Sequence, residues 1–305
     1  MRRRRNLRRF EILIIFAALA VVSISWVRSV PRGEPAAART FKAAAIQMYS
    51  RMGDTRANRD HMVELARKAA LRGADVIVFP EAAATGYVSE DSEIWTDPVR
   101  RPGEGRPLFG YAETLKGETV RALSSVARAM AVYIVVPFIE MDRGQKKYFN
   151  ALVLVGPDGA IKSHYRKISP WPRAEATWAA DGDLGLAWAD TEFGRLGLLI
   201  CYDIHSVARK LADKQCDTLL YSVAWVDAKP EMWFEERLPL LVKHYGVNLV
   251  AANWTFHPAR PPAEKGYGYS RIIGADGKIL ARAGANLCEE IVIAELPVGK
   301  HSKEE

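Results

Sequence analysis

The sequence predicts an α/β fold in which a single layered domain follows an N-terminal membrane-directing helix. Short apolar runs of strand length alternate with amphipathic segments of helical length from residue 41 to residue 297, with no repeat or internal linker. Of the 305 residues, 49% are hydrophobic and 26% are charged, which allows a substantial core and lacks the bias of a disordered chain. We therefore expect one α/β domain over 41–297.

Strands are predicted where runs of suitable length are apolar or alternate between apolar and polar residues. They cover residues 42–48, 75–79, 132–139, 148–155, 160–165, 196–200, 218–223, 247–252, 269–273 and 278–281. Helices are predicted over 59–72, 118–130 and 231–245, with one more directly after Cys201. Two hairpins are predicted because glycine permits positive φ in the turns Gly156-Pro157-Asp158-Gly159 and Gly274-Ala275-Asp276-Gly277.

The N-terminal residues predict a route to the membrane. Residues 1–11 form a basic head, and residues 12–27 are apolar apart from two serines, as in a transmembrane anchor or a signal peptide. Positive charge before an apolar run keeps that end in the cytoplasm, so we expect an extracytoplasmic body, membrane-anchored or released by cleavage into the periplasm or medium. Residues 28–40 are predicted to be a linker and residues 298–305 a C-terminal tail.

The composition argues against several other classes of function. The net charge of +7 comes largely from arginines of the head, and no basic stripe interleaved with aromatic residues follows, so nucleic-acid binding is not expected. The three cysteines, Cys201, Cys216 and Cys288, are too scattered for a disulfide framework or a zinc site. The six histidines do not pair at ligand spacing, so we expect no metal and no cofactor.

Three polar residues, Glu81, Lys167 and Cys201, follow strand-like runs, where layered α/β folds place their chemistry. A thiolate can attack an amide or nitrile carbon, and a carboxylate can take the thiol proton and pass it to the leaving amine. An ammonium can stabilise the oxyanion together with a backbone N–H, here that of Tyr202. Taken singly, the three residues also fit a surface carboxylate, a solvated lysine and a small buried cysteine.

The segments around these residues resemble the nitrilase (carbon–nitrogen hydrolase) superfamily. They are Phe79-Pro80-Glu81, Tyr165-Arg166-Lys167-Ile168 and Gly197-Leu198-Leu199-Ile200-Cys201-Tyr202-Asp203, with Asn150-Ala151-Leu152-Val153 between the first two. The resemblance implies an α-β-β-α sandwich of two mixed β-sheets flanked by helices, and a homodimer or larger assembly. It also implies that Glu81 is the general base and acid, Lys167 the oxyanion stabiliser and Cys201 the nucleophile. Glu175 matches the second glutamate of the family, which orients the lysine.

Further motifs look like the branch that contains the vanin pantetheinases and biotinidase, which are secreted or surface-tethered and cleave secondary amides. The motifs are Cys201-Tyr202-Asp203-Ile204, Ala224-Trp225 and Gly246-Val247-Asn248-Leu249-Val250-Ala251-Ala252-Asn253. The chain lacks the long C-terminal extension of those animal proteins, which leaves the substrate open. Five residues could line a substrate pocket or simply pack in the core: Trp171, Trp178, Trp225, Asn253 and Trp254.

The leading hypothesis is an amidase that uses water to release an amine or ammonia from a small or medium amide, including amides of the pantetheine or biotin type. A nitrile or an N-carbamoyl substrate fits the same chemistry. Acyl transfer at the membrane is a further alternative, although related lipoprotein acyltransferases carry several spans and this chain offers one candidate. A tethered binding protein without activity is the last alternative, and the presence of Glu81, Lys167 and Cys201 together argues against it.

Overall fold

In a computed structural model of the protein, the described residues are 39–51, 53–87, 111–172, 175, 178–225, 231–255, 268–284 and 288–303. They belong to one compact unit, Arg39–Glu305. The predicted basic head, the apolar run and most of the predicted linker lie outside the described residues. Within the part of the chain that is described, no helix is long and apolar enough to cross a membrane.

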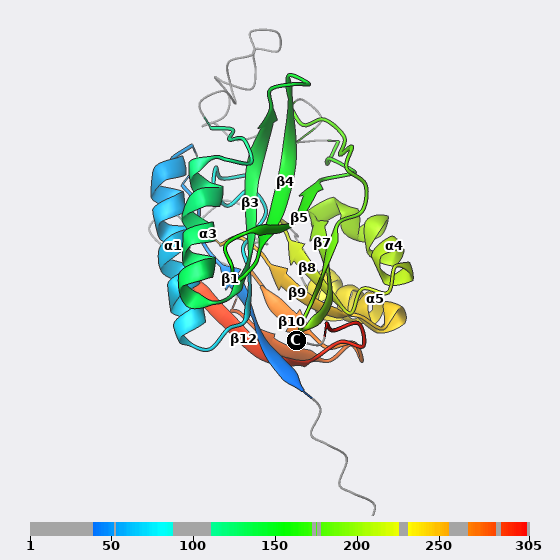
Figure 1. Cartoon of the computed structure of the whole chain (residues 1–305). Coiled ribbons are helices and arrows are strands. Elements are labelled where there is room, and N and C mark those ends of the chain that lie inside the picture. The colour runs from blue at the N-terminus through cyan, green and yellow to red at the C-terminus, as the bar shows by residue number, and fades with distance from the viewer. Residues whose placement is uncertain are drawn as a thin grey trace, which may run out of the picture. The chain divides into compact units, whose positions relative to one another are not determined.

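The described strands form two mixed sheets of six strands each (Figure 1). The first sheet holds β1 (Thr40–Gln47), β2 (Val76–Val78), β3 (Tyr133–Asp142), β4 (Lys147–Val155), β5 (Ile161–Arg166) and β12 (Glu290–Pro297), in the order β12-β1-β2-β3-β4-β5. The second holds β6 (Trp188–Thr191), β7 (Gly194–Ile200), β8 (Thr218–Ser222), β9 (Asn248–Ala252), β10 (Arg271–Ile273) and β11 (Ile279–Arg282), in the order β11-β10-β9-β8-β7-β6. Parallel pairs lie at the centre of each sheet, between β1, β2 and β3 and between β7, β8 and β9.

Helices cover the outer face of each sheet. Helices α1 (Thr55–Leu71) and α3 (Glu118–Met130) lie on the first sheet, and α4 (Val207–Asp213) and α5 (Leu238–Tyr245) lie on the second (Figure 1). Side chains alternate across a strand, so Ala43 and Ala45 of β1 pack between the sheets while Ala44 and Ile46 pack under α1 and α3. Burial on both faces explains why the central strands are almost continuously apolar in sequence. The expected α-β-β-α arrangement of two mixed sheets and helices is therefore confirmed.

Most predicted elements are confirmed, with differences at their ends. The helix predicted over 118–130 has those bounds, whereas α1 begins at Thr55, before the predicted residue 59. Asp54 explains the earlier start, because its Oδ1 accepts a hydrogen bond from the Ala57 N–H at 3.0 Å and caps the helix. The helix predicted over 231–245 is composite, a π-helix η3 (Glu231–Arg237) continued by α5. The helix predicted after Cys201 is a 3₁₀ turn, η2 (Cys201–His205), followed by α4.

The edge strands and the tail differ from the prediction. No strand is predicted from the sequence at β6 or β12. Because Thr40 of β1 pairs with Pro297 of β12, the first sheet begins inside the predicted linker over 28–40. Residues 298–303 of the predicted tail are docked on the second sheet: the Lys303 N–H donates to the Thr191 carbonyl at 2.8 Å, and the Lys300 N–H donates to Asp217 Oδ1 at 3.0 Å.

Candidate active site

The ends of three strands bring Glu81, Lys167 and Cys201 into one buried cluster. Lys167 directly follows β5 of the first sheet, Glu81 lies just beyond β2 of the same sheet, and Cys201 directly follows β7 of the second. The side chains therefore meet where the carboxyl ends of strands from both sheets converge. None of the three residues is more than 3% exposed, so charges within the cluster act on one another with little screening by water.

The Lys167 ammonium lies between two buried carboxylates. Its Nζ is 2.7 Å from Glu81 Oε1 and 2.7 Å from Glu175 Oε2, and none of these side chains is accessible to solvent. The structure thus brings Glu175 to the side of Lys167. Burial alone would lower the pKa of Lys167, but the charges of Glu175 and Glu81 outweigh it and raise that pKa, so the ammonium stays protonated.

The Glu81 carboxylate is fixed by donors on both oxygens. Oε1 accepts hydrogen bonds from Lys167 Nζ and from Asn150 Nδ2 at 2.7 Å each, and Oε2 accepts one from the Ala224 N–H at 3.0 Å. The Glu81 backbone is held as well, because Trp254 Nε1 donates to its carbonyl at 2.7 Å. With both oxygens and the backbone held, the carboxylate has one orientation toward the cluster.

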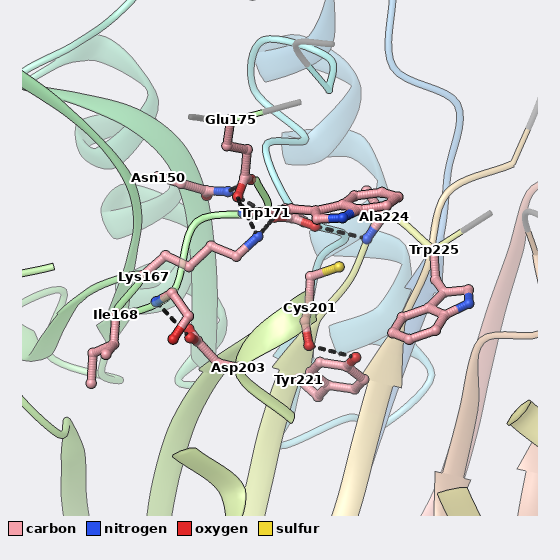
Figure 2. Close-up of polar contacts among 12 residues, drawn as sticks. Asn150, Lys167, Ile168, Trp171, Glu175, Cys201, Asp203, Tyr221, Ala224 and Trp225 are labelled. Atoms are coloured by element: carbon pink, nitrogen blue, oxygen red, sulfur yellow. Dashed lines mark hydrogen bonds and ion pairs between the residues drawn. The ribbon is translucent and has the colours of Figure 1, made fainter. Parts of the chain in front are cut away.

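Asn150 on β4 is a functional residue that is not among the site residues predicted from the sequence. Its side-chain amide donates to Glu81 Oε1 at 2.7 Å and to Glu175 Oε1 at 2.6 Å, while Lys167 bridges the same two carboxylates. Figure 2 shows Asn150 and Lys167 directed toward Glu175. Two like-charged carboxylates would repel each other in a buried site. Asn150 and Lys167 together hold them in place. In the sequence, the only indication of Asn150 is the motif Asn150-Ala151-Leu152-Val153, and this motif does not predict that Asn150 contacts the two carboxylates.

We expect Asn150→Asp to destabilise the protein by about 2–3 kcal/mol at pH 7, because it removes donors from two buried carboxylates and adds a third carboxyl beside them. Urea denaturation measures the loss, and the deficit should shrink as the pH falls, since protonation of the introduced carboxyl removes its charge. Asn248→Asp is the matched control. Asn248 is also buried, on β9, but its Nδ2 donates to Thr218 Oγ1 and its Oδ1 accepts from the Ala275 N–H. Neither partner is a carboxylate, so a smaller loss of stability is expected. An equal loss in both variants would contradict this role for Asn150.

Cys201 lies at a sharp turn between β7 and η2. Its φ of +38° is in the left-handed region, which a non-glycine residue adopts at a cost of about 1–3 kcal/mol. Tyr221 of β8 holds the turn, because its hydroxyl donates to the Cys201 carbonyl at 2.9 Å. Figure 2 shows the sulfur turned toward the side of the site that holds the Lys167 ammonium and the Ala224 N–H. The turn thus directs the thiol toward the charged side chains of the buried cluster.

Asp203 ties the Cys201 turn to the segment after Lys167. Its Oδ2 accepts a hydrogen bond from the Tyr165 hydroxyl at 2.6 Å, and its Oδ1 accepts one from the Ser169 N–H at 2.8 Å. Burial raises the pKa of Asp203 to about 6, although the Tyr165 hydroxyl and the Lys167 charge oppose that change. In the sequence, Asp203 stands only as part of the motif that begins at Cys201, and this motif does not predict its hydrogen bonds with Tyr165 and Ser169.

The pKa values of the thiol and the carboxylate suit proton exchange between them. Burial raises the pKa of Glu81 to about 8, with the charge of Lys167 opposing the shift and the charge of Glu175 adding to it. Burial and the charge of Glu81 also raise the pKa of Cys201, while Lys167 and the Ala224 N–H act in the opposite direction. The resting thiol therefore keeps its proton, and Glu81, with its pKa of about 8, can accept and return a proton near neutral pH.

The predicted pocket residues fall into different environments. Trp171 holds Glu175, because its backbone N–H donates to Glu175 Oε2 at 2.6 Å. Asn253 and Trp254 are 0% and 6% exposed, and their side chains hydrogen-bond to the backbone of Trp225 and to the Glu81 carbonyl. Trp178 packs against a separate apolar cluster that contains Ala112 and Ile139. Trp225 is partly exposed and directly follows Ala224.

A two-sheet α/β sandwich with a buried thiol beside a carboxylate and an ammonium is suited to the hydrolysis of carbon–nitrogen bonds. A family model described as carbon-nitrogen hydrolase matches residues 42–301. The chain therefore belongs to the carbon-nitrogen hydrolase family, within the nitrilase superfamily. It is a hydrolase of the amidase type, as relatives in that family indicate.

Known relatives cover most of the chain. The omega-amidase NIT2 of Homo sapiens is 29% identical over 249 residues, which are 77% of this chain and 80% of that protein. A nitrilase of Pyrococcus abyssi is 34% identical over 183 residues, 59% of this chain and 63% of that protein. Among solved structures, Nit3 of Saccharomyces cerevisiae has a TM-score of 0.70 at 23% identity, covering 85% of this chain and 90% of its own. An amidase from Nesterenkonia sp. has a TM-score of 0.69 at 19% identity, covering 85% and 91%.

Proposed function

We propose that the protein hydrolyses the carbon–nitrogen bond of a small or medium amide through a thioester on Cys201, with Glu81 and Lys167 completing the triad. The single observation that supports this most is the position of the Lys167 ammonium, 2.7 Å from Glu81 and 2.7 Å from Glu175 in a cluster closed to solvent. A fully buried charge cluster is costly as a structural device, since apolar residues of similar volume would fill the same space at no such cost. Its position beside a strained cysteine suggests a catalytic use.

In the first half of the reaction, the Cys201 sulfur attacks the amide carbon and its proton passes to Glu81. The tetrahedral oxyanion lies between the Lys167 ammonium and the Tyr202 N–H, which belongs to the first turn of η2, where backbone N–H groups generally lack partners within the helix. Glu81 then gives the proton to the leaving nitrogen, the carbon–nitrogen bond breaks, and an amine or ammonia departs. The acyl group remains as a thioester on Cys201.

In the second half, water attacks the thioester carbon and gives a proton to Glu81. The carbon–sulfur bond then breaks, the thiolate takes that proton back, and the carboxylic acid leaves. Glu175 touches no reacting atom in this scheme. It is a positioning residue that holds Lys167, assisted by the donors Asn150 Nδ2 and the Trp171 N–H on its two oxygens. Water is the only second substrate.

Trapping with hydroxylamine tests the proposal. The protein is incubated with primary amides, secondary amides, nitriles and N-carbamoyl amino acids, and the amine and acid released are quantified with and without hydroxylamine. We expect amine release from amides, with part of the acid replaced by hydroxamate, because hydroxylamine competes with water for the thioester. Amine release without hydroxamate at any hydroxylamine concentration would contradict the thioester, and release from nitriles alone would contradict the amidase.

We expect secondary amides of the pantetheine or biotin-amide type to be the better substrates within this panel. What supports this finer proposal is the resemblance of the segments 201–204, 224–225 and 246–253 to the pantetheinase and biotinidase branch. A preference for unsubstituted primary amides would favour a different branch of the family and would leave the chemistry of the site unchanged.

The rate should depend on pH through Glu81. Only the ionised carboxylate can accept the thiol proton, so kcat/KM should rise with pH up to an apparent pKa of about 8 and level off above it. Lys167 and Glu175 interact with Glu81, so this apparent value belongs to the cluster as a whole. Initial rates of amine release across pH 5 to 10 (about five units) provide the measurement. A profile that is already level above pH 6 would contradict the raised pKa.

The place of action and the assembly are part of the proposal. Six arginines in residues 1–11 and the apolar run over 12–27 support a membrane-anchored or secreted enzyme with its catalytic domain outside the cytoplasm. Protease added to intact cells or spheroplasts should digest residues 41–305, as detected with an antibody against the C-terminal region. Full protection until lysis would place the enzyme in the cytoplasm. The family resemblance supports a homodimer or larger assembly, which sedimentation velocity can test.

A further inference from the structure

A cluster of aromatic rings adjoins the Cys201 turn. The Trp225 and Trp233 rings are stacked, with centroids 4.6 Å apart and planes 4° from parallel. His205 lies against both, at 5.9 Å from Trp225 and 5.2 Å from Trp233, and Tyr202 lies 5.4 Å from His205. Tyr202 and His205 belong to η2, the turn that begins at Cys201. We call these four rings the aromatic cluster.

Both backbone polar groups of Trp225 are hydrogen-bonded to one buried side-chain amide, that of Asn253. The Trp225 N–H donates to Asn253 Oδ1 at 3.0 Å, and its carbonyl accepts a hydrogen bond from Asn253 Nδ2 at 3.2 Å. Asn253 is itself fixed, because Ser270 Oγ accepts from its backbone N–H at 2.9 Å. The residue before Trp225 is Ala224, whose N–H binds Glu81. The hydrogen bonds of Ala224 and Trp225 therefore fix the position of the Trp225 ring relative to the Glu81 carboxylate.

Trp233 is held by a different buried group. It lies in the π-helix η3, and irregular turns of this kind occur frequently at functional sites. Arg271 is 0% exposed, its Nη1 donates to the Phe234 carbonyl, and its Nη2 lies 3.1 Å from the Glu235 carboxylate. A fully buried arginine thus fixes the two residues that follow Trp233. Two separate sets of polar contacts, those of Asn253 and those of Arg271, therefore hold the backbone around the stacked rings. Packing of an apolar core does not require such contacts.

The aromatic cluster has an accessible side and an unused donor. Tyr202 is 40% exposed, His205 is exposed and Trp225 is partly exposed, whereas Trp233 behind them is 7% exposed. Burial lowers the pKa of His205, so its ring is neutral at pH 7. Within the described part of the chain, the buried Trp233 Nε1 has no hydrogen-bond partner. An unpaired buried donor costs stability and is kept where a ligand or water can use it.

We propose that the aromatic cluster is a subsite for an aromatic ring in the acyl part of the substrate, so that among amides with the same amine an aryl acyl group is hydrolysed faster than a saturated one of similar size. This inference rests on the proposed function and specifies the acyl groups that its site favours. The acyl part is indicated because the acyl chain stays attached to the Cys201 sulfur, and two of the four rings lie on the turn that carries that sulfur (Figure 2 shows Cys201 and Trp225). Flat rings favour an aromatic partner over a saturated ring of similar size through stacked or edge-to-face contacts.

A matched pair of substrates tests the subsite. The amides 3-phenylpropanamide and 3-cyclohexylpropanamide have rings of similar size, separated from the carbonyl by two methylenes, so their intrinsic reactivities are alike. We expect wild-type kcat/KM to favour the phenyl amide by at least about threefold. Trp225→Leu should lower the phenyl-to-cyclohexyl ratio by about fivefold, and Trp225→Phe, which keeps a ring, should retain most of it. A ratio within one enzyme is independent of the fraction of molecules that are folded.

Trp188→Leu is the matched control. Trp188 lies on the edge strand β6 against Arg195, outside the aromatic cluster, and its loss should leave the ratio as in wild type. An unchanged ratio in Trp225→Leu, with both amides hydrolysed, would overturn the subsite and leave the proposed function standing. Failure of the wild-type enzyme to hydrolyse these two amides, their N-alkyl secondary counterparts and pantetheine, with no acyl adduct on Cys201, would overturn the proposed function itself.

Discussion

Replacing Cys201 with alanine is expected to lower amide hydrolysis by at least about four orders of magnitude, because no other group in the buried cluster can form the covalent bond to the acyl carbon. Glu81 and Lys167 are held by each other, Asn150 and Glu175, and none of those contacts uses the sulfur. The fold should therefore survive the change. Ammonia or amine release from a reactive amide measures the loss, and circular dichroism with a thermal melt measures the fold.

The other cysteines provide matched controls. Cys216 is buried on the path into β8 and Cys288 is exposed near β12, and neither touches the buried cluster. Burial raises the pKa of Cys216 to about 12, so this thiol is a poor nucleophile at neutral pH. Cys216→Ala and Cys288→Ala should keep near wild-type turnover per folded molecule. Near-normal turnover in Cys201→Ala would show that the thioester scheme is wrong.

Replacing Lys167 with methionine should abolish activity and also destabilise the fold by about 3–5 kcal/mol, because Glu81 and Glu175 would keep their burial and lose their only cationic partner in the described structure. The Lys167 charge opposes the rise in the pKa of Glu81 to about 8, so its removal should raise that pKa further, and the loss of stability should grow as the pH rises from 8 to 10 (about two units). Urea denaturation at several pH values measures both effects. Lys147→Met is the control, since Lys147 is exposed at the start of β4 and should change stability by less than about 0.5 kcal/mol.

Lys167→Arg separates charge from geometry. Arginine keeps the positive charge, so part of the stability should return, but its planar guanidinium is larger and cannot occupy the same point between Glu81 and Glu175. We expect kcat to stay close to that of Lys167→Met. Activity of Lys167→Arg within about tenfold of wild type, or ~1.4 kcal/mol in barrier, would reduce Lys167 to a structural residue.

Much of the fold is predictable because it depends on local patterns. The strands of the two sheet centres are buried on both faces, and this gives continuous apolar runs such as Val76–Val78 and Leu196–Ile200. Both hairpin turns are confirmed, with Gly159 at φ +75° and Gly277 at φ +84°, where a side chain would be strained. The edge strand β12 is only partly buried and alternates weakly, so its register with β1 follows from the tertiary fold.

The site is less predictable than the fold for a physical reason. Glu81, Lys167 and Cys201 could be selected because each follows a strand, and the ends of neighbouring strands meet at one edge. Asn150 lies in the middle of an apolar strand, 69 residues from Glu81, and only the pairing of β3, β4 and β5 brings its amide to both carboxylates. Trp233 is placed by a π-helix and by Arg271, and no local pattern predicts either.

Mass spectrometry of the wild-type enzyme, quenched in acid during turnover of an amide, can detect the thioester on Cys201 itself. We expect a covalent adduct that raises the mass of the protein by the acyl group less the one hydrogen lost from the thiol, located by peptide mapping on Cys201 and absent from Cys201→Ala. Hydroxylamine added before the quench should remove it. An adduct confined to Cys216 or Cys288, or turnover with no adduct under any quench, would contradict the thioester on Cys201.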